Sequence, residues 1–364
     1  MSWHMISSQH ARERGRICRN GEEFVVVTAK DIAVFSGVSR TTVFAVVKGK
    51  PGVSERTRER VLAAIREHGY ETGLVQKSLV SEFSKMIGVV VGNINNPFYT
   101  EVVSGIHSVL RSRGYHHILH HGTEDRPEEG VEEFEALREC ELRGYIMSAG
   151  ESEQYEQHIR WVVKSKRPLV TIMEAPGLET HMVRFDNRKG SQDATDYLIR
   201  KGHHRIACLT GPARSATAKE RILGFLESLV SHEVEFHDAM TVRAGDTSDD
   251  GYRAALKVLA DPATRPTALL CCNDLVAIGC YRAAHELGLH IPNNVSIVGF
   301  DGIDMGEVMG PPLTTLSVFP HEIGRLAAEM LLSVIDGNNG RQRHLEKVVE
   351  HKLIERESVL TLKG

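Results

Sequence analysis

The chain has 364 residues, with 44 Lys and Arg against 48 Asp and Glu and a formal net charge of −4. This length exceeds one ordinary domain and predicts two or three. No apolar run is long enough to cross a membrane and no apolar signal-peptide core stands near the start, so we expect a cytoplasmic protein without a membrane partner.

The charges and cysteines are unevenly placed. Residues 1–85 carry 14 Lys and Arg against 9 Asp and Glu, whereas the remainder carries 30 against 39. A basic head on an acidic body is typical of a phosphate-binding module joined to a part that does not bind nucleic acid. The six cysteines follow no disulfide spacing, and Cys208, Cys271 and Cys272 lie in apolar runs. We interpret these three as small core residues in a reducing compartment.

Residues 1–26 mix Trp, His, Arg and Ser without a helical or strand period. We expect this N-terminal extension to be disordered, with no fold of its own. Two interpretations of this extension stay open: it is a basic arm of the protein, or it lies upstream of the protein's natural start.

Residues 27–72 predict three short helices joined by tight turns. Thr28 and Asp31 form a capping-box start for the first helix. Gly37 ends that helix, because glycine enters left-handed backbone space without strain. The inward side of the helix is predicted to be Ile32, Ala33 and Phe35.

Ser39 is predicted to cap a second helix over residues 40–48. Its apolar residues recur at helical spacing and face inward: Val43, Val46 and Val47. Its outward face carries Arg40, Thr41, Phe44 and Lys48. A third helix follows Ser54, with Val61, Leu62 and Ile65 buried. Two helices joined by a glycine turn, the second with a polar face, describe an all-α helix-turn-helix that reads DNA.

Residues 73–85 form a polar connector with one short helical pattern over residues 74–80. Seven residues fall below the roughly 12–15 that an isolated helix needs in water. We therefore expect this hinge segment to order only against a partner.

From residue 86 to residue 364, apolar strands alternate with amphipathic helices. The predicted strands are residues 87–91, 117–120, 144–148, 169–173, 183–185, 205–209, 268–272 and 295–300. Helical patterns include residues 98–113, 192–201, 247–259 and 275–287. Continuous apolar strands separated by helices indicate an α/β core of doubly wound parallel sheets.

The core splits near Asp186 into two similar halves. We assign about 86–184 plus 319–344 to an N-subdomain and about 186–314 plus 345–364 to a C-subdomain. Ligands of such folds bind outside the carboxyl ends of the strands, so we expect a cleft between the halves.

With these motifs in order, the chain resembles the LacI/GalR family of bacterial transcription regulators from Val27 to the end. The stretches that match the family are, in chain order, T-A-K-D-I-A with S-G-V-S-R-T-T-V, V-S-E-R-T-R-E-R-V, N-P-F-Y, G-H-H-R-I-A, N-D-L-V-A-I-G, V-S-I-V-G-F-D, P-L-T-T-L and L-I-E-R-E-S. The resemblance implies a periplasmic-binding-protein-like core that closes on a small-molecule effector. It also implies a homodimer on near-palindromic double-stranded operator DNA. No coiled-coil heptads follow the last motif, which favours a dimer over a tetramer.

The resemblance also implies which residues contact DNA. Arg40, Thr41 and Ala45 fall where the recognition helix of the family meets base edges. Leu79 falls on the hinge leucine that wedges into the minor groove and bends the duplex. The full predicted DNA-binding set is Thr28, Ser39, Arg40, Thr41, Thr42, Phe44, Ala45, Lys48 and Leu79.

Two departures from the family pattern concern DNA binding. Phe44 and Ala45 replace a serine and a long polar residue; Ala45 cannot make a bidentate base contact, so a different half-site is expected. Thr72-Gly73 replaces the usual Pro-Asn at the start of the hinge. Glycine costs about 1 kcal/mol relative to alanine within a helix, so the hinge should fold less readily.

For the effector, the resemblance implies Phe98, Tyr99, Asp186, Arg221, Asn273 and Asp301. Arg221 would offer a planar donor fork, and Asp301 would accept paired hydroxyl groups. Asp274 we interpret as the cap of the following helix. Ser215 and Glu174 stand where the purine-binding member has an arginine and an aromatic residue, which favours a sugar or sugar acid over a purine.

Four histidines, His116, His117, His120 and His121, stand in one predicted strand. Alternate residues share a face of a strand, but a zinc site needs a further ligand and a closed geometry. We interpret them as strand-end and surface residues and expect no metal or cofactor.

Two other functions compete. A solute-binding protein could use the same core, although the helix-turn-helix and the lack of a signal peptide oppose it. An enzyme would need a nucleophile with its base or paired carboxylates; Asp301 and Asp304 are the nearest pair, and their spacing indicates a loop. We therefore favour a repressor controlled by a small molecule.

Overall fold

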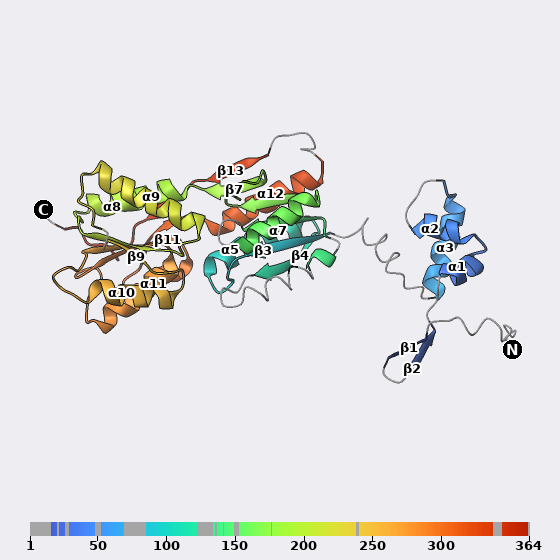
Figure 1. Cartoon of the computed structure of the whole chain (residues 1–364), viewed down its shortest axis with the longest axis horizontal. Coiled ribbons are helices and arrows are strands. Elements are labelled where there is room, and N and C mark those ends of the chain that lie inside the picture. Colours follow the sequence, from blue (N-terminus) through green and yellow to red (C-terminus); the bar gives the residue numbers. More distant parts are fainter. Residues whose placement is uncertain are drawn as a thin grey trace. The chain divides into compact units, whose positions relative to one another are not determined.

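The structure is a computed structural model. It describes residues 16–19, 22–25, 29–47, 52–68, 85–121, 134, 137–140, 142–148, 153–175, 177–237, 240–337 and 344–362. The chain forms two units, Met1–Ser84 and Lys85–Gly364. Figure 1 labels the helices and strands of each along the ribbon. We call the helical part of the first unit the head and the second unit the core.

The head contains three helices, α1 (Ala29–Ser36), α2 (Arg40–Val47) and α3 (Glu55–His68). They enclose a small apolar centre formed by Ile32, Val43, Val46, Val61 and Ile65. Gly37 adopts a φ of +62° between α1 and α2, a conformation that glycine tolerates without strain. The predicted helix-turn-helix is confirmed.

The prediction that Phe35 lies on the inward side of the first helix is wrong. Its side chain is 50% exposed and stacks on the ring of His68, with centroids 3.8 Å apart. The inward position belongs to Ser36, which is one turn from Ile32 and donates a hydrogen bond to the Ile32 carbonyl at 2.6 Å.

Regular structure also occurs before the head. β1 (Arg16–Arg19) pairs antiparallel with β2 (Glu22–Val25). The expectation that residues 1–26 lack any fold is therefore wrong at these strands. Asn20-Gly21 separates them in the sequence, and this dipeptide is a strong hairpin signal.

The core contains two six-stranded sheets. The N-subdomain sheet is entirely parallel, and its strands in spatial order are β13 (Glu346–Val349), β7 (His181–Phe185), β6 (Leu169–Ile172), β5 (Gly144–Ser148), β3 (Met86–Val91) and β4 (His116–His121). All eight predicted core strands are present, each within two residues of its predicted ends.

The C-subdomain sheet is parallel except at one edge, where β14 runs antiparallel to β12. Its strands in spatial order are β14 (Lys352–Ile354), β12 (Thr314–Ser317), β11 (Ser296–Asp301), β10 (Ala268–Cys271), β8 (Ile206–Thr210) and β9 (Thr241–Arg243).

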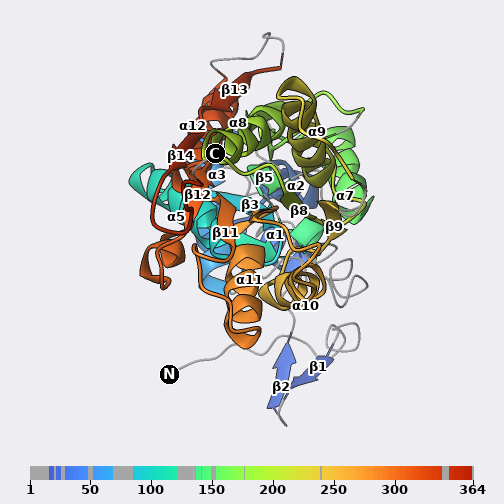
Figure 2. The same cartoon turned by 90° about the vertical axis from the view of Figure 1, so that its left-hand side faces the viewer.

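Helices cover both faces of each sheet, as the apolar strands require. In the N-subdomain, α5 (Pro97–Ser112) and α12 (Pro320–Ile335) cover one face and α7 (Glu153–Lys164) the other. In the C-subdomain, α8 (Asn187–Arg200) and α9 (Ala216–Ser231) lie opposite α10 (Ser248–Leu259) and α11 (Asp274–Glu286). Figure 2 shows α8 and α9 above the strands of the C-subdomain and α10 and α11 below them.

Neighbouring helices of the core touch through glycine. A Cβ at Gly324 of α12 would lie 1.9 Å from the Val102 carbonyl oxygen of α5. A Cβ at Gly224 of α9 would lie 2.1 Å from the Arg188 carbonyl oxygen of α8. Backbones this close leave no room for a side chain, so these glycines set the helix spacing.

The chain passes between the subdomains after β7, after β12 and after β13. The assignment of residues 345–364 to the C-subdomain is wrong for β13, which pairs with β7 in the N-subdomain sheet, Glu346 opposite Met182. Only β14 and the residues after it return to the C-subdomain sheet. The error arose because nothing local in the sequence says which sheet edge a late strand joins.

The cysteines whose side chains the structure describes, Cys140, Cys208, Cys271, Cys272 and Cys280, are all free. Cys208, Cys271 and Cys272 are buried, as predicted. Within the described ranges, no helix is both long and apolar enough to span a bilayer.

Candidate functional site

A cavity of about 210 Å³ lies between the two halves of the core. Three helix starts face it. Asn96 caps α5 and accepts the Phe98 N–H at 3.0 Å, Ser215 caps α9, and Asn273 caps α11 and accepts the Val276 N–H at 2.7 Å. These ends meet because parallel strands bring the helices that follow them to one edge of each sheet.

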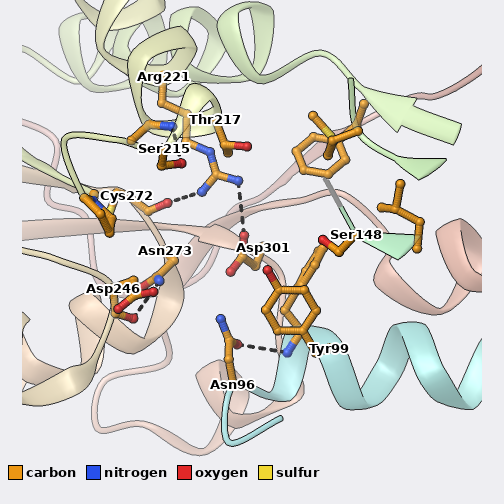
Figure 3. A pocket seen from close by; sticks show the side chains of 17 residues that line it. Asn96, Tyr99, Ser148, Ser215, Thr217, Arg221, Asp246, Cys272, Asn273 and Asp301 are labelled. Carbon is orange, nitrogen blue, oxygen red and sulfur yellow. Dashed lines mark hydrogen bonds and ion pairs between the residues drawn. The ribbon is translucent and has the colours of Figure 1, made fainter. Parts of the chain in front are cut away.

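Arg221 is the cation of the cavity wall. Its Nε donates to Asn187 Oδ1 at 2.8 Å, a guanidinium nitrogen donates to the Cys272 carbonyl oxygen, and Nη2 lies 3.4 Å from Asp301 Oδ1 (Figure 3). The guanidinium carbon is 3.6 Å from the centre of the Phe300 ring, a cation–π contact. Arg221 is therefore held in one orientation before any ligand binds.

Asp301 is the carboxylate opposite this arginine. It ends β11, is 5% exposed, and adopts a φ of +113°, which is strained for any residue except glycine. In Figure 3 one oxygen of this carboxylate points toward the Arg221 guanidinium. A hydrogen-bond donor fork beside an acceptor pair matches hydroxyl groups, which donate and accept at once.

Aromatic rings form an apolar part of the wall. The Phe98 ring lies edge-on to Tyr99, with centroids 5.0 Å apart, and 6.5 Å from Phe185. All three residues line the cavity. Such rings bind the C–H face of a small polar ligand while the polar groups hold its hydroxyls.

The cavity brings together five of the six residues predicted for effector contact: Phe98, Tyr99, Arg221, Asn273 and Asp301. Asp186 is not among the lining residues. Its side chain is exposed and caps α8, with Oδ1 accepting the Lys189 N–H at 2.9 Å. Asp186 stands between a strand and a helix, and in the sequence an aspartate at such a position fits a helix cap as well as a ligand contact.

Asp274 differs from its predicted role as a helix cap, which Asn273 performs instead. Its side chain is 0% exposed and accepts hydrogen bonds from elsewhere in the C-subdomain. Burial raises the pKa of this carboxyl to about 6, although the hydrogen bonds from Thr315, Ile303 and Gly302 act in the opposite direction.

Sequence reasoning missed several lining residues, among them Asp246, Ser148 and Thr217. Ser148 ends β5 and Asp246 follows β9, so both stand where a strand gives way to a loop. Their position at a strand end is the sequence feature that could have identified them, since ligands of such sheets bind at the carboxyl ends of strands. Asp246 also accepts the Asn273 Nδ2–H on its backbone carbonyl at 2.8 Å.

The cavity offers little for catalysis. Asp304 is exposed and does not line the cavity, so it does not pair with the Asp301 carboxylate there. Burial raises the pKa of the Cys272 thiol well above its usual range, so this lining cysteine is no thiolate nucleophile. Across the described ranges, no three His, Cys, Asp or Glu side chains are grouped as a metal site requires.

The head presents the predicted DNA-reading helix. In α2, Arg40 and Thr41 are exposed, while Thr42, Phe44 and Ala45 are half-buried. Ser39 caps α2 by accepting the Thr42 N–H at 3.1 Å, and its hydroxyl contacts the Thr42 hydroxyl at 2.9 Å. Among the predicted contacts that can be placed, Arg40 and Thr41 are free to reach base edges. Thr28, Lys48 and Leu79 lie outside the described residues.

A helix-turn-helix head and a two-part α/β core with a polar, ligand-sized cavity define a DNA-binding protein that responds to a small molecule. Comparison with known families agrees. Residues 28–72 match the bacterial regulatory proteins of the lacI family, and residues 195–359 match the periplasmic binding protein-like domain.

Individual relatives match nearly the whole chain. The ribose operon repressor of Haemophilus influenzae is 31% identical over 342 residues, covering 93% of this chain and 100% of the relative. The HTH-type transcriptional repressor PurR of Aliivibrio fischeri is 30% identical, covering 92% and 98%. The chain therefore belongs to the lacI family: it is a cytoplasmic transcription regulator with a DNA-binding head and an effector-binding core, and not an enzyme.

Solved structures show the same architecture. The complex of the transcriptional regulator CelR with cellobiose has a TM-score of 0.68 at 27% identity, covering 91% of this chain and 99% of that one. A LacI family regulator of Enterococcus faecium with bound ribose has a TM-score of 0.66 at 27% identity, covering 76% and 100%. The lac repressor dimer bound to operator and the anti-inducer ONPF has a TM-score of 0.66 at 25% identity, covering 92% and 99%.

Proposed function

We propose that the effector of this repressor is a neutral monosaccharide bound in the core cavity. The observation that carries the proposal is the pairing of the Arg221 fork with the Asp301 carboxylate beside the Phe98 and Phe185 rings. Sugars need this combination, because their hydroxyls both donate and accept and their ring C–H groups pack on aromatic faces.

Charge and size narrow the class of ligand. The lining residues with a formal charge are Arg221, Asp246 and Asp301, so the wall carries one more negative charge than positive. This balance disfavours a sugar acid or a phosphate. The cavity volume of about 210 Å³ falls below the roughly 300–1,000 Å³ of sites for drug-sized ligands, which favours one sugar ring over two.

The proposed contacts on the effector are those of Arg221, Asp301, Asn273, Phe98 and Tyr99, joined by Asp246. Asp186 is left out, because its carboxylate caps α8. Relatives support the class: a family regulator of Enterococcus faecium has been solved with ribose, and the Haemophilus influenzae relative is a ribose operon repressor.

The proposed output is occupancy of a near-palindromic operator by a homodimer. The lac repressor structure of similar fold is a dimer bound to operator, which supports this assembly. Arg40 and Thr41 would read bases in the major groove, and Leu79, in the proposed hinge of residues 73–85, would wedge into the minor groove. A ligand shifts such a switch only by its difference in affinity for the two states.

A thermal-shift screen tests the effector. The full chain is melted with D-ribose, other pentoses and hexoses, cellobiose, gluconate and hypoxanthine, each in separate wells. A neutral monosaccharide should raise the melting temperature, because it binds the folded state selectively. The sugar that does so should also change binding to promoter fragments in fluorescence anisotropy. A shift with gluconate, hypoxanthine or cellobiose alone would contradict the proposed ligand class.

A further inference from the structure

The Asp274 carboxylate is buried directly behind the cavity and accepts three hydrogen bonds. Its Oδ2 accepts the Gly302 N–H at 2.9 Å and the Ile303 N–H at 2.8 Å, and its Oδ1 accepts the Thr315 hydroxyl at 2.6 Å. Gly299 makes room for it, since a Cβ there would lie 2.0 Å from Asp274 Oδ1. Asp274 is not a lining residue of the cavity.

The two amides that Asp274 holds belong to the residues immediately after Asp301. Asp301 has a φ of +113°, and a strained backbone conformation persists only where its surroundings fix it. One fixed point is the Asp301 carbonyl, which accepts the Val318 N–H at 3.2 Å. The hydrogen bonds from Gly302 and Ile303 to Asp274 supply the others.

The same helix start also places Asn273. This residue caps α11 and lines the cavity near Asp301, as Figure 3 shows. Asp274 is the next residue, so the first turn of α11 connects two cavity groups from different strands. A displacement of the loop after β11 would move Asp301 away from both Asn273 and Arg221.

We propose that Asp274 is the positioning residue of the effector site. By accepting the Gly302 and Ile303 amides, it holds the Asp301 backbone in the conformation that directs the carboxylate toward Arg221 and the cavity. The inference rests on the proposed function for the identity of the ligand, but the restraint on the loop is independent of any ligand.

An acceptor at this position is required, and a negative charge is not. The side-chain oxygen of asparagine can accept both amides, and its NH₂ group can donate to the Thr315 hydroxyl, which rotates to accept. Asp274→Asn should therefore keep the loop in place. Asp274→Ala removes the acceptor and leaves two N–H groups without partners, a loss worth about ten-fold or more in an equilibrium.

Hydrogen exchange of the full chain, followed by mass spectrometry, tests the restraint without a ligand. Peptides containing Gly302 and Ile303 should exchange about ten-fold faster or more in Asp274→Ala than in the wild type. Asp274→Asn should stay close to the wild type. Thr315→Val is the matched control: it removes the third hydrogen bond of Asp274 but leaves both loop amides held, and should also stay close.

Calorimetric titration with the sugar that stabilises the wild type tests the consequence. Its Kd should rise about ten-fold or more in Asp274→Ala and change less than about three-fold in Asp274→Asn and Thr315→Val. Should the alanine variant not fold, Asp274→Ser takes its place, because its shorter side chain cannot reach both amides.

The outcomes separate the two ideas. Unchanged exchange at Gly302 and Ile303 in Asp274→Ala overturns the positioning role, and so does an asparagine variant that exchanges as fast as the alanine variant. If exchange rises as expected but no sugar binds the wild type, the proposed effector class fails and the positioning role stands. If exchange rises while the sugar Kd does not, the link from loop to effector site is refuted.

Discussion

Arg221 and Asp301 contact each other at the edge of the core cavity, with Nη2 3.4 Å from Oδ1 and side chains only 11% and 7% exposed. The arginine comes from α9 and the aspartate from the end of β11, 80 residues apart in the chain. A buried ion pair adds little net stability, and removing one member leaves the other charge uncompensated. The pair is better explained by ligand binding than by stability.

The first prediction concerns the arginine fork. Arg221→Lys keeps the charge but cannot contact Asn187, Cys272 and Asp301 together, because an ammonium group lacks the planar fork. We expect the Kd for the effector sugar to rise at least about ten-fold in calorimetric titration. Arg282→Lys, at an exposed pair with Asp249, is the control and should leave the Kd unchanged. Equal affinity of both variants would remove Arg221 from the site.

The second prediction concerns the aspartate. Asp301→Ala should abolish the effect of the sugar on operator binding, because the paired acceptor for its hydroxyls is lost. Stability should fall by about 3 kcal/mol or more, since the Arg221 charge is left buried without its partner. Fluorescence anisotropy with and without sugar measures the response, and circular dichroism confirms that the variant is folded. A normal response in folded protein would show that the pocket assignment is wrong.

The third prediction concerns pH. The pKa of Asp274 rises from 3.8 to about 6 on folding because the group is buried. Between these values the folded state binds more protons than the unfolded state, so this group makes the protein less stable as pH rises from about 4 to about 6. The two pKa units correspond to roughly 3 kcal/mol, which is lost above pH 6.

Urea unfolding of the wild type and Asp274→Asn across this range isolates that contribution, because all other groups are shared. The free energy of unfolding of the wild type, relative to the variant, should fall as pH rises from 4 to 6 and then level off. Asp304→Asn, at an exposed aspartate nearby, should run parallel to the wild type. Parallel curves for Asp274→Asn would disprove the raised pKa.

The fourth prediction concerns DNA. Operator binding should weaken steeply as salt rises, because the head releases counterions from phosphates. Leu79→Ala should weaken operator binding and leave the effector Kd nearly unchanged, since it removes only the minor-groove wedge. Electrophoretic mobility shifts at several salt concentrations, with calorimetry alongside, measure both. A salt-independent Kd would contradict a phosphate-gripping head, and unaltered operator affinity in Leu79→Ala would rule out the wedge.

The fifth prediction concerns helix packing. Gly324→Ala should destabilise the core by about 1–3 kcal/mol, because the new Cβ would lie 1.9 Å from the Val102 carbonyl oxygen. Chemical unfolding measures the loss. Ser108→Ala, on the exposed side of α5, places an alanine in the partner helix without adding a Cβ. It removes only the hydrogen bond from the Ser108 hydroxyl to the Gly105 carbonyl and should have little effect. Similar stabilities of the two variants would mean that the helices separate without strain.

The sequence alone was enough for the parts of this protein that depend on local patterns. Helix caps, glycine turns and the period of apolar residues located α1, α2 and α3 and all eight predicted core strands. The stretches around Asn273 and Asp301 lie at strand ends, where ligands of such sheets bind, and the family resemblance assigned these two residues to the effector site. Such signals are local because backbone conformation and burial on one face are decided within a few residues.

The tertiary structure decided which role each residue has when similar residues stand at similar positions in the chain. Asp186, Asn273 and Asp274 all stand just after a strand, yet the first caps α8 at the surface, the second faces the cavity, and the third is buried behind it. β13 joins the N-subdomain sheet, whereas β14, which follows shortly after it, joins the C-subdomain sheet. These outcomes depend on which strand pairs with which across more than a hundred residues. No local pattern encodes that choice, because it depends on the free energy of packing the whole core.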